Sequence, residues 1–507
     1  MSRPDVSISA WFAARADRSP HRRALTFEGI TVTYAALLDR VERLAGGLAA
    51  AGVGAGDRVA FLGANQPALI ETFLAANRLG AVFLPLNFRL AAPEIDFILA
   101  DSEPAAIVAD SAHRPVLDAI DSRSATRVCV DGTDAVGWTC MAELLVAAQA
   151  PARTAEEDDA AILMYTSGTT GRPKGVILTN GNLFWNNINL EHLYDVREDD
   201  VTLVVAPMFH IAGLNVTVFT TLFKGGEVRI HRSFDASAVL DEVERSSITT
   251  MFVVPAMLNA ICARPDFAGR DLSSLRVVIC GGAPVPEALL RRYADRGIGV
   301  LQGYGLTETS PAAIFLTAEH ALSRIGSAGR PPLFVEVQLR TDDGTVITES
   351  GVRGEVCLRG PNVSPGYWNR PDATAEAHDA DGWFHTGDIG VRDAEGFYAI
   401  VDRVKDMVIT GGENVSPAEV ENAVYTHPAV ADVAVIGVPD ERWGEAVTAV
   451  VVLRPDADLT LEQLRDHCSR SLARYKLPNR LILSDELPRN ASGKVQKFRL
   501  TESIHAI

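Results

Sequence analysis

A cluster of small, hydroxyl-bearing and basic residues, TSGTTGRPKG, runs from Thr166 to Gly175. Gly168 and Gly171 permit positive φ angles and a close backbone approach, while hydroxyls and exposed backbone amides can donate to phosphate oxygens. Lys174 adds a flexible cation, but the stretch lacks the Gly-Lys-Ser/Thr ending of the common P-loop. The residue types therefore predict a phosphate-binding loop, and a glycine- and serine-rich surface turn is the alternative.

Four further stretches carry residues suited to nucleotide chemistry. YGLTE, which ends at Glu308, offers an aromatic ring for a base, a hydroxyl for a phosphate and a carboxylate for Mg²⁺. HTGD places Asp388 after a tight turn, where it could hold the two hydroxyls of a ribose. Arg403 and Lys494 stand in DRVKDMVITGGENV and PRNASGKVQK. Alone, each stretch also fits a capped strand end, a turn aspartate or a solvated surface run.

The elements around these residues alternate between short apolar runs and helical stretches. Such alternation predicts a sheet covered by helices, with a helix over Tyr34–Ala51. The glycine loop is predicted to join two strands, at Ala161–Tyr165 and Val176–Leu178, with Thr179 capping the next helix. After about Gly326, alternation around an Asp-Gly turn favours hairpins. Further helices are expected at Ser416–Val424, capped by Ser416, and at Leu461–Leu472.

Composition narrows the class of protein. The 507 residues have a net charge of -18, from 47 basic and 65 acidic side chains, so nucleic acid is a poor general partner. The six cysteines form no Cys-x-x-Cys pair, which suits buried thiols better than a disulfide frame or a zinc site. With neither a secretory signal nor a run of about 20 apolar residues, a soluble cytoplasmic protein is expected, with transient peripheral membrane contact and homodimerisation left open.

Six motifs in order carry a family resemblance: TSGTTGRPKG, GGAPVP, YGLTE, WFHTGD, DRVKDMVITGGEN and PRNASGK. Together they resemble the adenylate-forming superfamily of acyl- and aryl-CoA synthetases, luciferases and peptide-synthetase adenylation domains. The resemblance runs from about Ser9 to about Phe498 and is strongest to fatty-acyl-CoA and hydroxycinnamate-type CoA ligases. It implies an α/β fold: a large N-terminal domain, residues 1–402, of helix-covered β-sheets plus a β-barrel-like part, and a small mobile α+β domain, residues 403–507.

The resemblance also implies an ATP site. The β- and γ-phosphates would be held by Thr166, Ser167, Gly168, Thr169, Thr170 and Lys174. The adenosine and α-phosphate would be bound by Gly282, Ala283, Pro284, Tyr304, Gly305, Thr307, Asp388 and Arg403, with Mg²⁺ on Glu308. Lys494 would stabilise the charge that develops during adenylation, although Asn490 and Ala491 replace hydroxyl residues that relatives often carry there.

Further positions follow from the same resemblance. Lys405 falls at the hinge about which the small domain rotates, bringing Gly411 and Gly412 to a pantetheine tunnel for CoA. Arg474 and Lys476 could meet CoA phosphates but are expected to be surface cations. His210 would stand where the acyl pocket meets the thioester site. The pocket itself would draw on Phe209, Ile211, Ala212, Gly213, Leu214 and Thr309, with Gly305 shared between the two sites.

These expectations describe an ATP-dependent acid–CoA ligase that forms an acyl-AMP intermediate. The pocket stretches Pro207–Phe223 and Leu301–Leu316 contain no Lys or Arg, so a dicarboxylate would lack a counter-charge. A medium- or long-chain fatty acid is the favoured substrate, and a cinnamate-type aryl acid is the alternative. A ligase loading a carrier protein stays open, whereas a peptide-synthetase domain is disfavoured because Asp235 in FDAS is better interpreted as a helix N-cap. Luciferase-type oxidation and a non-enzymatic ATP sensor are also disfavoured.

Overall fold

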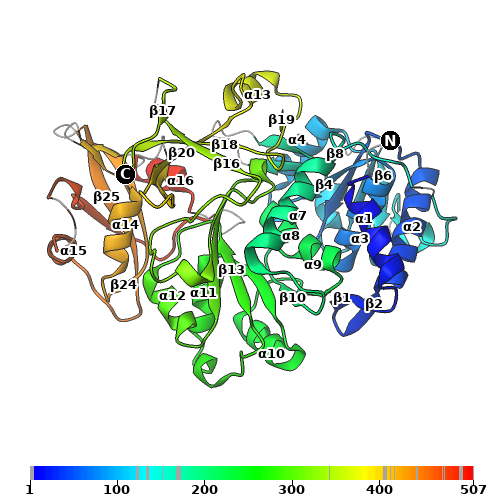
Figure 1. Ribbon diagram of the computed structural model, residues 1–507, viewed down its shortest axis with the longest axis horizontal. Coiled ribbons are helices and arrows are strands. Elements are labelled where there is room, and N and C mark those ends of the chain that lie inside the picture. The colour runs from blue at the N-terminus through cyan, green and yellow to red at the C-terminus, as the bar shows by residue number, and fades with distance from the viewer. Residues whose placement is uncertain are drawn as a thin grey trace. The chain divides into compact units, whose positions relative to one another are not determined.

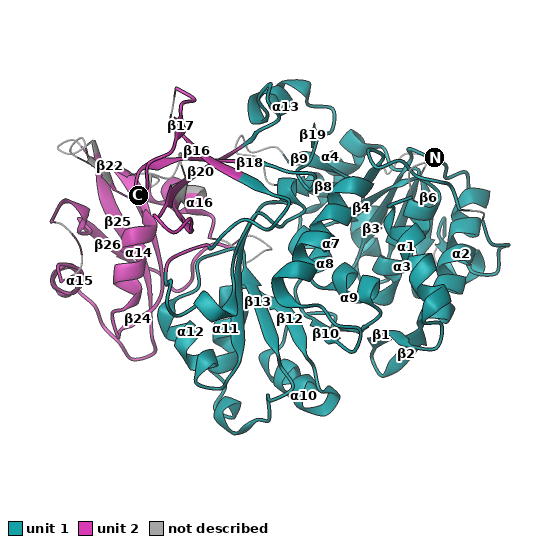
Figure 2. Ribbon diagram, viewed as in Figure 1, with its two compact units in different colours: residues 1–325, 329–336, 358–384 teal, residues 326–328, 337–357, 385–507 magenta. Residues whose placement is uncertain are grey.

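The computed structural model describes residues 5–120, 125–132, 136–150, 152–166, 173–341, 343–403, 408–410, 413–415, 417–440, 444–470, 472, 474–489 and 495–505. The elements are labelled in Figure 1. The chain forms two compact units, which are coloured separately in Figure 2. The first comprises residues 1–325, 329–336 and 358–384, and the second comprises residues 326–328, 337–357 and 385–507. The predicted boundary after Asp402 stays a prediction.

Two large sheets form the centre of the first unit within its described residues. One has the strand order β15 (Ile314–Leu316), β14 (Gly299–Tyr304), β13 (Val277–Gly281), β12 (Thr250–Val253), β10 (Val201–Val204), β11 (Glu227–Ile230), β1 (Arg23–Phe27) and β2 (Ile30–Thr33). The other has the order β19 (Gly366–Tyr367), β9 (Lys174–Thr179), β8 (Ala160–Thr166), β4 (Val82–Leu86), β3 (Arg58–Leu62), β5 (Ala106–Ala109), β6 (Thr126–Cys129) and β7 (Thr139–Cys140). Most interior pairs are parallel, as the alternation with helices predicts, whereas the interior pair of β8 and β9 is antiparallel.

Helices connect and cover these strands. They are α1 (Ile8–Arg18), α2 (Tyr34–Ala50), α3 (Pro67–Arg78), α4 (Ala92–Ser102), α5 (Arg114–Asp118), α6 (Met141–Leu144), α7 (Asn180–Tyr194), α8 (Ile211–Asn215), α9 (Val218–Lys224), α10 (Ala236–Ser246), α11 (Pro255–Cys262), α12 (Glu287–Ala294) and α13 (Pro371–Ala377). Two predicted caps are confirmed. The Thr179 hydroxyl accepts from the Asn182 amide, and the Asp235 carboxylate accepts from the Ala238 amide.

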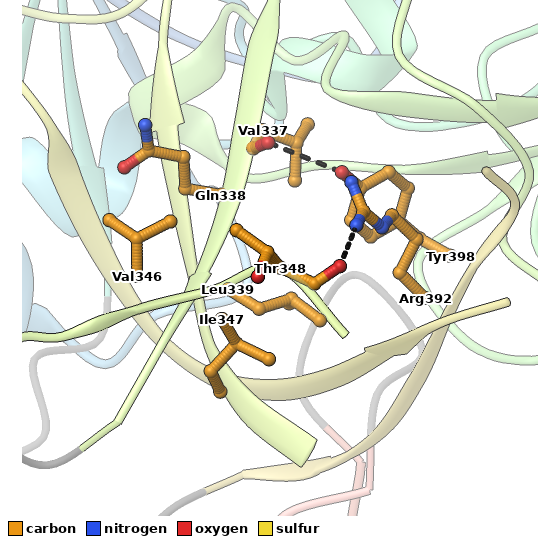
Figure 3. A pocket seen from close by; sticks show the side chains of 8 residues that line it. All are labelled: Val337, Gln338, Leu339, Val346, Ile347, Thr348, Arg392 and Tyr398. Carbon is orange, nitrogen blue, oxygen red and sulfur yellow. Dashed lines mark hydrogen bonds between the residues drawn. The ribbon is translucent and has the colours of Figure 1, made fainter. Parts of the chain in front are cut away.

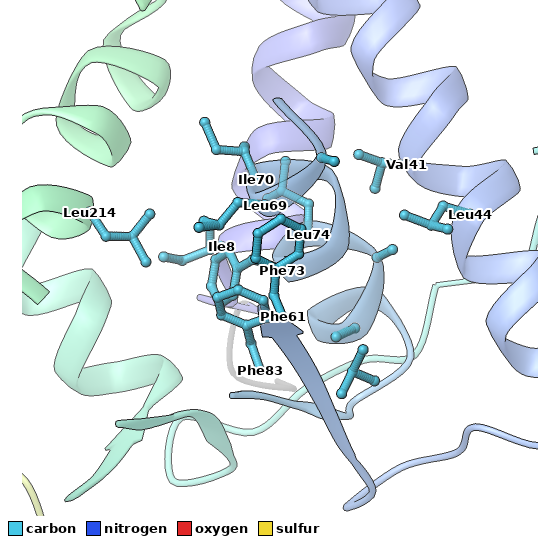
Figure 4. Close-up of a cluster of buried hydrophobic side chains, with 14 of the residues drawn as sticks. Ile8, Val41, Leu44, Phe61, Leu69, Ile70, Phe73, Leu74, Phe83 and Leu214 are labelled. Carbon is cyan, nitrogen blue, oxygen red and sulfur yellow. The ribbon is translucent and has the colours of Figure 1, made fainter. Parts of the chain in front are cut away.

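The largest core of the first unit joins α1, α2 and α3 to both sheets. Figure 4 shows Phe61, Phe73, Phe83 and Leu214 packed in this core. The ring centroids of Phe73 and Phe83 lie 5.3 Å apart, a separation typical of favourable aromatic pairs. Each such fully buried side chain contributes about 1.5–3 kcal/mol relative to exposure, so the core fixes the strands whose ends carry the predicted site.

An antiparallel sheet, most of whose residues belong to the second unit, has the order β17 (Val346–Ile347), β16 (Glu336–Arg340), β18 (Arg353–Arg359), β20 (Phe384–Arg392) and β21 (Tyr398–Arg403). The predicted hairpin around the Asp-Gly turn is its β16–β17 pair. The rest of the unit contains β22 (Val408–Thr410), β23 (Glu413–Val415), α14 (Pro417–Tyr425), β24 (Val430–Asp440), β25 (Gly444–Leu453), α15 (Leu461–Cys468), β26 (Arg480–Leu483) and α16 (Lys497–His505).

The expected fold class is confirmed: a large α/β part with sheets and helices is accompanied by a smaller α+β part. The helix predicted over Leu461–Leu472 is shorter, because it ends at Cys468. There the Ser469 hydroxyl donates to the Asp466 carbonyl, a local bond that competes with helix continuation. The cap predicted at Ser416 lies outside the described residues. No helix in the described part of the chain is long and apolar enough to cross a membrane.

Candidate active site

The glycine loop joins two antiparallel strands, as the sequence predicts. Thr166, at the end of β8, pairs with Lys174, at the start of β9, so the base of the loop is closed by the sheet. A Cβ at Gly175 would lie 2.8 Å from Leu163 Cδ1, so the Leu163 side chain packs closely against the glycine backbone. Ser167, Gly168, Thr169 and Thr170 lie outside the described residues. The sheet therefore places two predicted phosphate ligands, Thr166 and Lys174, side by side.

Tyr367 links the base of this loop to the predicted magnesium ligand. β19 pairs with β9, opposing Tyr367 to Val176. The Lys174 ammonium lies 5.3 Å from the centroid of the Tyr367 ring, and the phenol donates to Glu308 Oε1 at 2.9 Å. Burial, followed by the charge of Glu308, raises the pKa of the Tyr367 phenol above its ordinary range. The phenol therefore stays protonated and keeps donating to the carboxylate.

Sequence reasoning did not single out Tyr367. The signal that could have found it is the aromatic residue in SPGYWN, which follows a glycine with a φ of +141°. An aromatic residue on a two-residue strand outside the main motifs carries no periodic pattern. Its role becomes visible only when β19 pairs with β9 and Glu308 comes within hydrogen-bond distance.

The YGLTE segment is held by buried asparagines. The Asn362 amide donates to the carbonyls of Thr309 and Ala312 at 2.7 and 2.6 Å. Asn215 donates to the Ser310 carbonyl, and Asn186 accepts from the Ala312 amide. All three asparagines are fully buried. Because buried amides without partners are costly, these bonds hold the residues after β14 in one conformation.

Within this segment, the short 3₁₀ turn Thr307–Thr309 carries the predicted α-phosphate contact and Glu308. A Cβ at Gly305 would lie 1.6 Å from the Pro311 carbonyl oxygen, so only glycine fits. The Thr309 hydroxyl donates toward the Leu306 and Pro311 carbonyls and accepts from the Leu306 amide. The Thr309 hydroxyl thus shapes the turn, and its predicted place in the acyl pocket stays a prediction.

Gln302 is a second residue that sequence reasoning missed. It shares a face of β14 with Tyr304, two residues further on. Its amide nitrogen is buried and has no hydrogen-bond partner among the described residues. An unpaired buried donor is costly, so Nε2 is available to an acceptor on a ligand bound beside Tyr304.

The predicted adenine slot follows β13. Gly282 has a φ of +87°, in the left-handed region that favours glycine. Gly282, Ala283 and Pro284 are exposed, so a ligand can reach this turn. Gly281, which ends β13, pairs with Gly303 on β14. The two predicted motifs therefore lie on neighbouring strands of one sheet.

The PMFH stretch is fixed by Asn65, whose amide donates to the Ala206 carbonyl and accepts from the Met208 amide, both at 2.9 Å. The rings of Phe209 and His210 have centroids 4.5 Å apart. A Cβ at Gly213 would lie 2.2 Å from the Pro207 oxygen, which explains the glycine in α8. Other predicted pocket residues divide between clusters: Ile211 and Leu214 belong to the main core, and Ala212 packs against the cluster that contains Phe252, Ala312 and Phe315.

In the second unit, Asp388 is buried and lies in β20 opposite Arg403 of β21. The Asp388 amide donates to Thr386 Oγ1, which in turn donates to the Val356 carbonyl. The pairing brings the backbones of the two predicted ribose-site residues together. The Arg403 side chain is not described, and Lys405, Gly411, Gly412 and Lys494 lie outside the described residues.

Two further observations concern Lys494 and Lys476, the remaining predicted cations. Arg489 and Val495, which stand on either side of the undescribed residues that include Lys494, form an antiparallel bridge. Lys476 donates to both carboxylate oxygens of Glu419, at 2.6 and 2.7 Å. This ion pair favours the interpretation of Lys476 as a structural cation.

Two cavities lie away from these motifs. One, of about 90 Å³, is lined by residues of β16, β17, β20 and β21. Figure 3 shows it beside the bonds from Tyr398 to the Val337 carbonyl and from Arg392 to the Thr348 carbonyl. The other, of about 290 Å³, contains the bidentate Arg40–Glu71 ion pair. Neither cavity is lined by a predicted site residue.

Comparison with known proteins shows to which family the chain belongs. A family model described as AMP-binding enzyme matches residues 12–368, and the model of the AMP-binding enzyme C-terminal domain matches residues 419–494. The chain is 46% identical over 490 residues, 97% of each chain, to a feruloyl-CoA synthase of Amycolatopsis sp. It is 43% identical over 479 residues, 94% of each chain, to the long-chain-fatty-acid–CoA ligase FadD13 of Mycobacterium tuberculosis.

A solved structure supports the same family assignment. The o-succinylbenzoate CoA synthetase MenE of Bacillus subtilis, in complex with ATP and a magnesium ion, is 35% identical and superposes with a TM-score of 0.86, covering 97% of this chain and 98% of that one. The carboxylate of Glu308, which accepts from Tyr367, offers oxygen atoms of the kind that Mg²⁺ prefers, and its role as the magnesium ligand stays a prediction. The chain belongs to the AMP-binding enzyme family, within the adenylate-forming superfamily, and is an ATP-dependent acid–CoA ligase that uses ATP, Mg²⁺ and coenzyme A.

Proposed function

We propose that the acid activated by this ligase is an aryl-substituted acid of the hydroxycinnamate class. The observation that carries the proposal is a pair of opposed glycines between two phenylalanine rings. Sequence reasoning placed this class second, after fatty acids. The identity to a feruloyl-CoA synthase over 97% of both chains supports the same choice.

The glycine pair is Gly281 on β13 and Gly303 on β14, which oppose each other in register. A Cβ at Gly303 would lie 2.6 Å from Phe315 Cε1, and a Cβ at Gly281 would lie 3.6 Å from Phe252 Cε2. Both phenylalanines belong to one apolar cluster, and Ala212 of the predicted acyl pocket packs against it. A Cβ at Gly281 would also lie 2.8 Å from the Gly303 carbonyl oxygen, so the two glycines let aromatic rings pack closely over neighbouring strands.

An apolar cluster that contains two aromatic rings suits a planar ring more than a long alkyl chain. Aromatic rings pack favourably at centroid separations of about 4.5–7 Å, and a rigid ring loses less conformational entropy on binding than a chain with many rotatable bonds. The fatty-acid alternative keeps one specific support, the 43% identity to FadD13. Neither class needs the counter-charge that Pro207–Phe223 and Leu301–Leu316 lack.

The residues of the chain divide the chemistry as follows. Lys174 and Thr166 hold the β- and γ-phosphates at the base of the hairpin, and Thr307 contacts the α-phosphate. Glu308 would hold Mg²⁺, whose charge would neutralise that of the phosphates. In-line attack of the carboxylate needs alignment and charge stabilisation, and Lys494 provides the latter. By the family resemblance, Lys405 would be the hinge that exchanges Lys494 for Gly411 and Gly412, which would admit the CoA thiol, and His210 would act where the thioester forms.

A substrate panel tests the acid class. CoA-dependent AMP release is measured for ferulate, coumarate and cinnamate, for saturated acids of increasing length, and for malonate. We expect kcat/KM for the hydroxycinnamates to exceed that for the saturated acids by at least about tenfold, the discrimination typical of a few apolar contacts. A preference for long saturated acids would reject the proposal in favour of the fatty-acid class, and a preference for malonate would reject both.

Two further expectations belong with this proposal. Homodimerisation stays a prediction, which light scattering coupled to size-exclusion chromatography tests. The cytoplasmic location also stays a prediction, and fractionation of the producing cells tests it.

A further inference from the structure

Three metal-ligating side chains converge in the sheet of the second unit. Glu355 and Cys357 share one face of β18, and His385 lies on the neighbouring strand β20. His385 Nδ1 lies 2.8 Å from Glu355 Oε2 and 3.5 Å from Cys357 Sγ. One ligand atom from each of the three residues falls within 4.8 Å of the others.

We propose that Glu355, Cys357 and His385 bind one zinc-like divalent cation, and that its binding weakens the ribose grip of Asp388. The claim that a metal binds depends only on the cluster of Glu355, Cys357 and His385. The claim that the metal weakens ribose binding rests on the proposed role of Asp388 in the ligase. The ion would act as an inhibitor, distinct from the Mg²⁺ that Glu308 holds.

The chemical types of the three ligands determine which metal ion they favour. Thiolate and imidazole favour Zn²⁺ and similar ions, whereas Mg²⁺ prefers oxygen ligands in octahedral geometry. For tetrahedral zinc, the bond lengths put sulfur and nitrogen ligands about 3.5 Å apart and nitrogen and oxygen ligands about 3.4 Å apart. The first separation matches the distance from Cys357 Sγ to His385 Nδ1. The second requires the Glu355 oxygen to move away by about half an ångström.

A metal ion can reach the three side chains, and the proton that its binding displaces has a place to go. Cys357 is fully buried, but the side chains of Glu355 and His385 are 25% and 27% exposed, so the ion reaches the thiol from their side. On binding, the Cys357 thiol gives its proton to the solvent and the sulfur forms the metal bond. His385 coordinates as neutral imidazole and Glu355 as carboxylate. A water molecule completes the four-coordinate shell that three protein ligands leave open.

One hydrogen bond couples the cluster to the predicted ribose ligand. Glu355 Oε1 accepts from the Gly387 amide at 3.0 Å, and Gly387 is the residue before Asp388. Gly387 has a φ of +67°, so this turn depends on the conformational freedom of glycine. When the Glu355 carboxylate moves away from His385 to accommodate the ion, its bond with the Gly387 amide on the same strand as His385 is disturbed, and the turn that presents Asp388 shifts. The metal therefore acts on nucleotide binding through Glu355.

Cobalt(II) titration of the full-length, metal-free protein tests the site directly. We expect one equivalent of Co²⁺ to produce a thiolate-to-cobalt charge-transfer band in the near ultraviolet, and Zn²⁺ to displace it. In Cys357→Ser the band should be absent, and the affinity for Zn²⁺ should fall by at least about 100-fold, since even outer-shell changes cost 10–100-fold. Cys129→Ser, which removes another buried thiol, is the matched control and should keep the band. A missing band in the wild type, or an equal band in Cys357→Ser, overturns the proposal.

Calorimetry of AMP binding tests the coupling. Zinc should weaken AMP binding by at least about fivefold in the wild type and leave Cys357→Ser unchanged. In the presence of saturating Mg²⁺, zinc should likewise inhibit acid-dependent AMP release in the wild type only. A cobalt band with no change in AMP affinity overturns the coupling. Failure of the ligase assignment would appear as no AMP release by the zinc-free wild type in saturating Mg²⁺, and the cobalt titration would still decide the metal site.

Discussion

The segment Tyr304–Ala313 and the turn His385–Asp388 both present predicted nucleotide ligands, but different chemistry holds them. Around the first, neutral amides of fully buried asparagines bond the backbone. Around the second, the Gly387 amide depends on a carboxylate that is one-quarter exposed. A buried neutral scaffold is rigid and costly to disturb, whereas the interactions of a partly exposed carboxylate contribute less and are easier to disturb. The segment predicted to meet the phosphates thus has a fixed geometry, whereas the turn predicted to meet the ribose is easier to adjust.

Replacing Asn362 with Leu should have the largest effect. The change leaves the carbonyls of Thr309 and Ala312 without their donor, and each unsatisfied buried group costs about 1–3 kcal/mol. We expect a large fall in the free energy of unfolding, measured by urea titration. We also expect kcat/KM to fall by about 100-fold, because a shift of about 1 Å in catalytic groups has effects of that size.

Asn187 provides the matched control for this substitution. It lies on α7, is 1% exposed, and neither its amide nitrogen nor its oxygen has a partner among the described residues. Asn187→Leu should therefore leave stability unchanged or raise it. Equal destabilisation by both substitutions would show that volume, and not hydrogen bonding, holds the segment.

Tyr367→Phe should have an intermediate effect. It removes the hydrogen bond to Glu308 but keeps the ring under Lys174. A hydrogen bond to a charged group contributes about 1.5–3 kcal/mol, so we expect kcat/KM to fall by about tenfold and the Mg²⁺ concentration for half-maximal activity to change. Tyr398→Phe, which removes a bond to the Val337 carbonyl, is the control and should leave the Mg²⁺ dependence unaltered. Unchanged Mg²⁺ dependence in Tyr367→Phe would remove Tyr367 from the site.

The difference between the two regions also explains what the sequence could predict. Strands on both sides of the glycine loop, the caps Thr179 and Asp235 and the α/β class all follow from local patterns of a few residues. The supports of the site come from far along the chain. Asn362 lies 53 residues from Thr309, and Tyr367 lies 59 residues from Glu308. Neither has a periodic neighbourhood, so only the folded sheet reveals their partners.

The metal cluster is hidden for the same reason. Cys357 and His385 are 28 residues apart, and the absence of a Cys-x-x-Cys pair argued against a zinc site. Spacing rules detect ligands on one turn or hairpin, whereas these residues meet across two strands of a sheet. Burial of all six cysteines agrees with the expectation of buried thiols. Cys357 is buried like the other cysteines, but it also lies beside two metal-ligating side chains, Glu355 and His385.

Glu355→Gln should have the smallest effect in the absence of metal. The amide oxygen of glutamine can still accept from the Gly387 amide, so only the charge is lost. Interactions of partly exposed charges contribute about 0–1 kcal/mol, and we expect KM for ATP to rise by less than about fivefold. Glu336→Gln, at the exposed pair with Arg359, is the matched control. If Glu355→Gln lowered activity as strongly as Asn362→Leu, the ribose turn would be as rigid as the YGLTE segment, and the contrast between the two regions would be wrong.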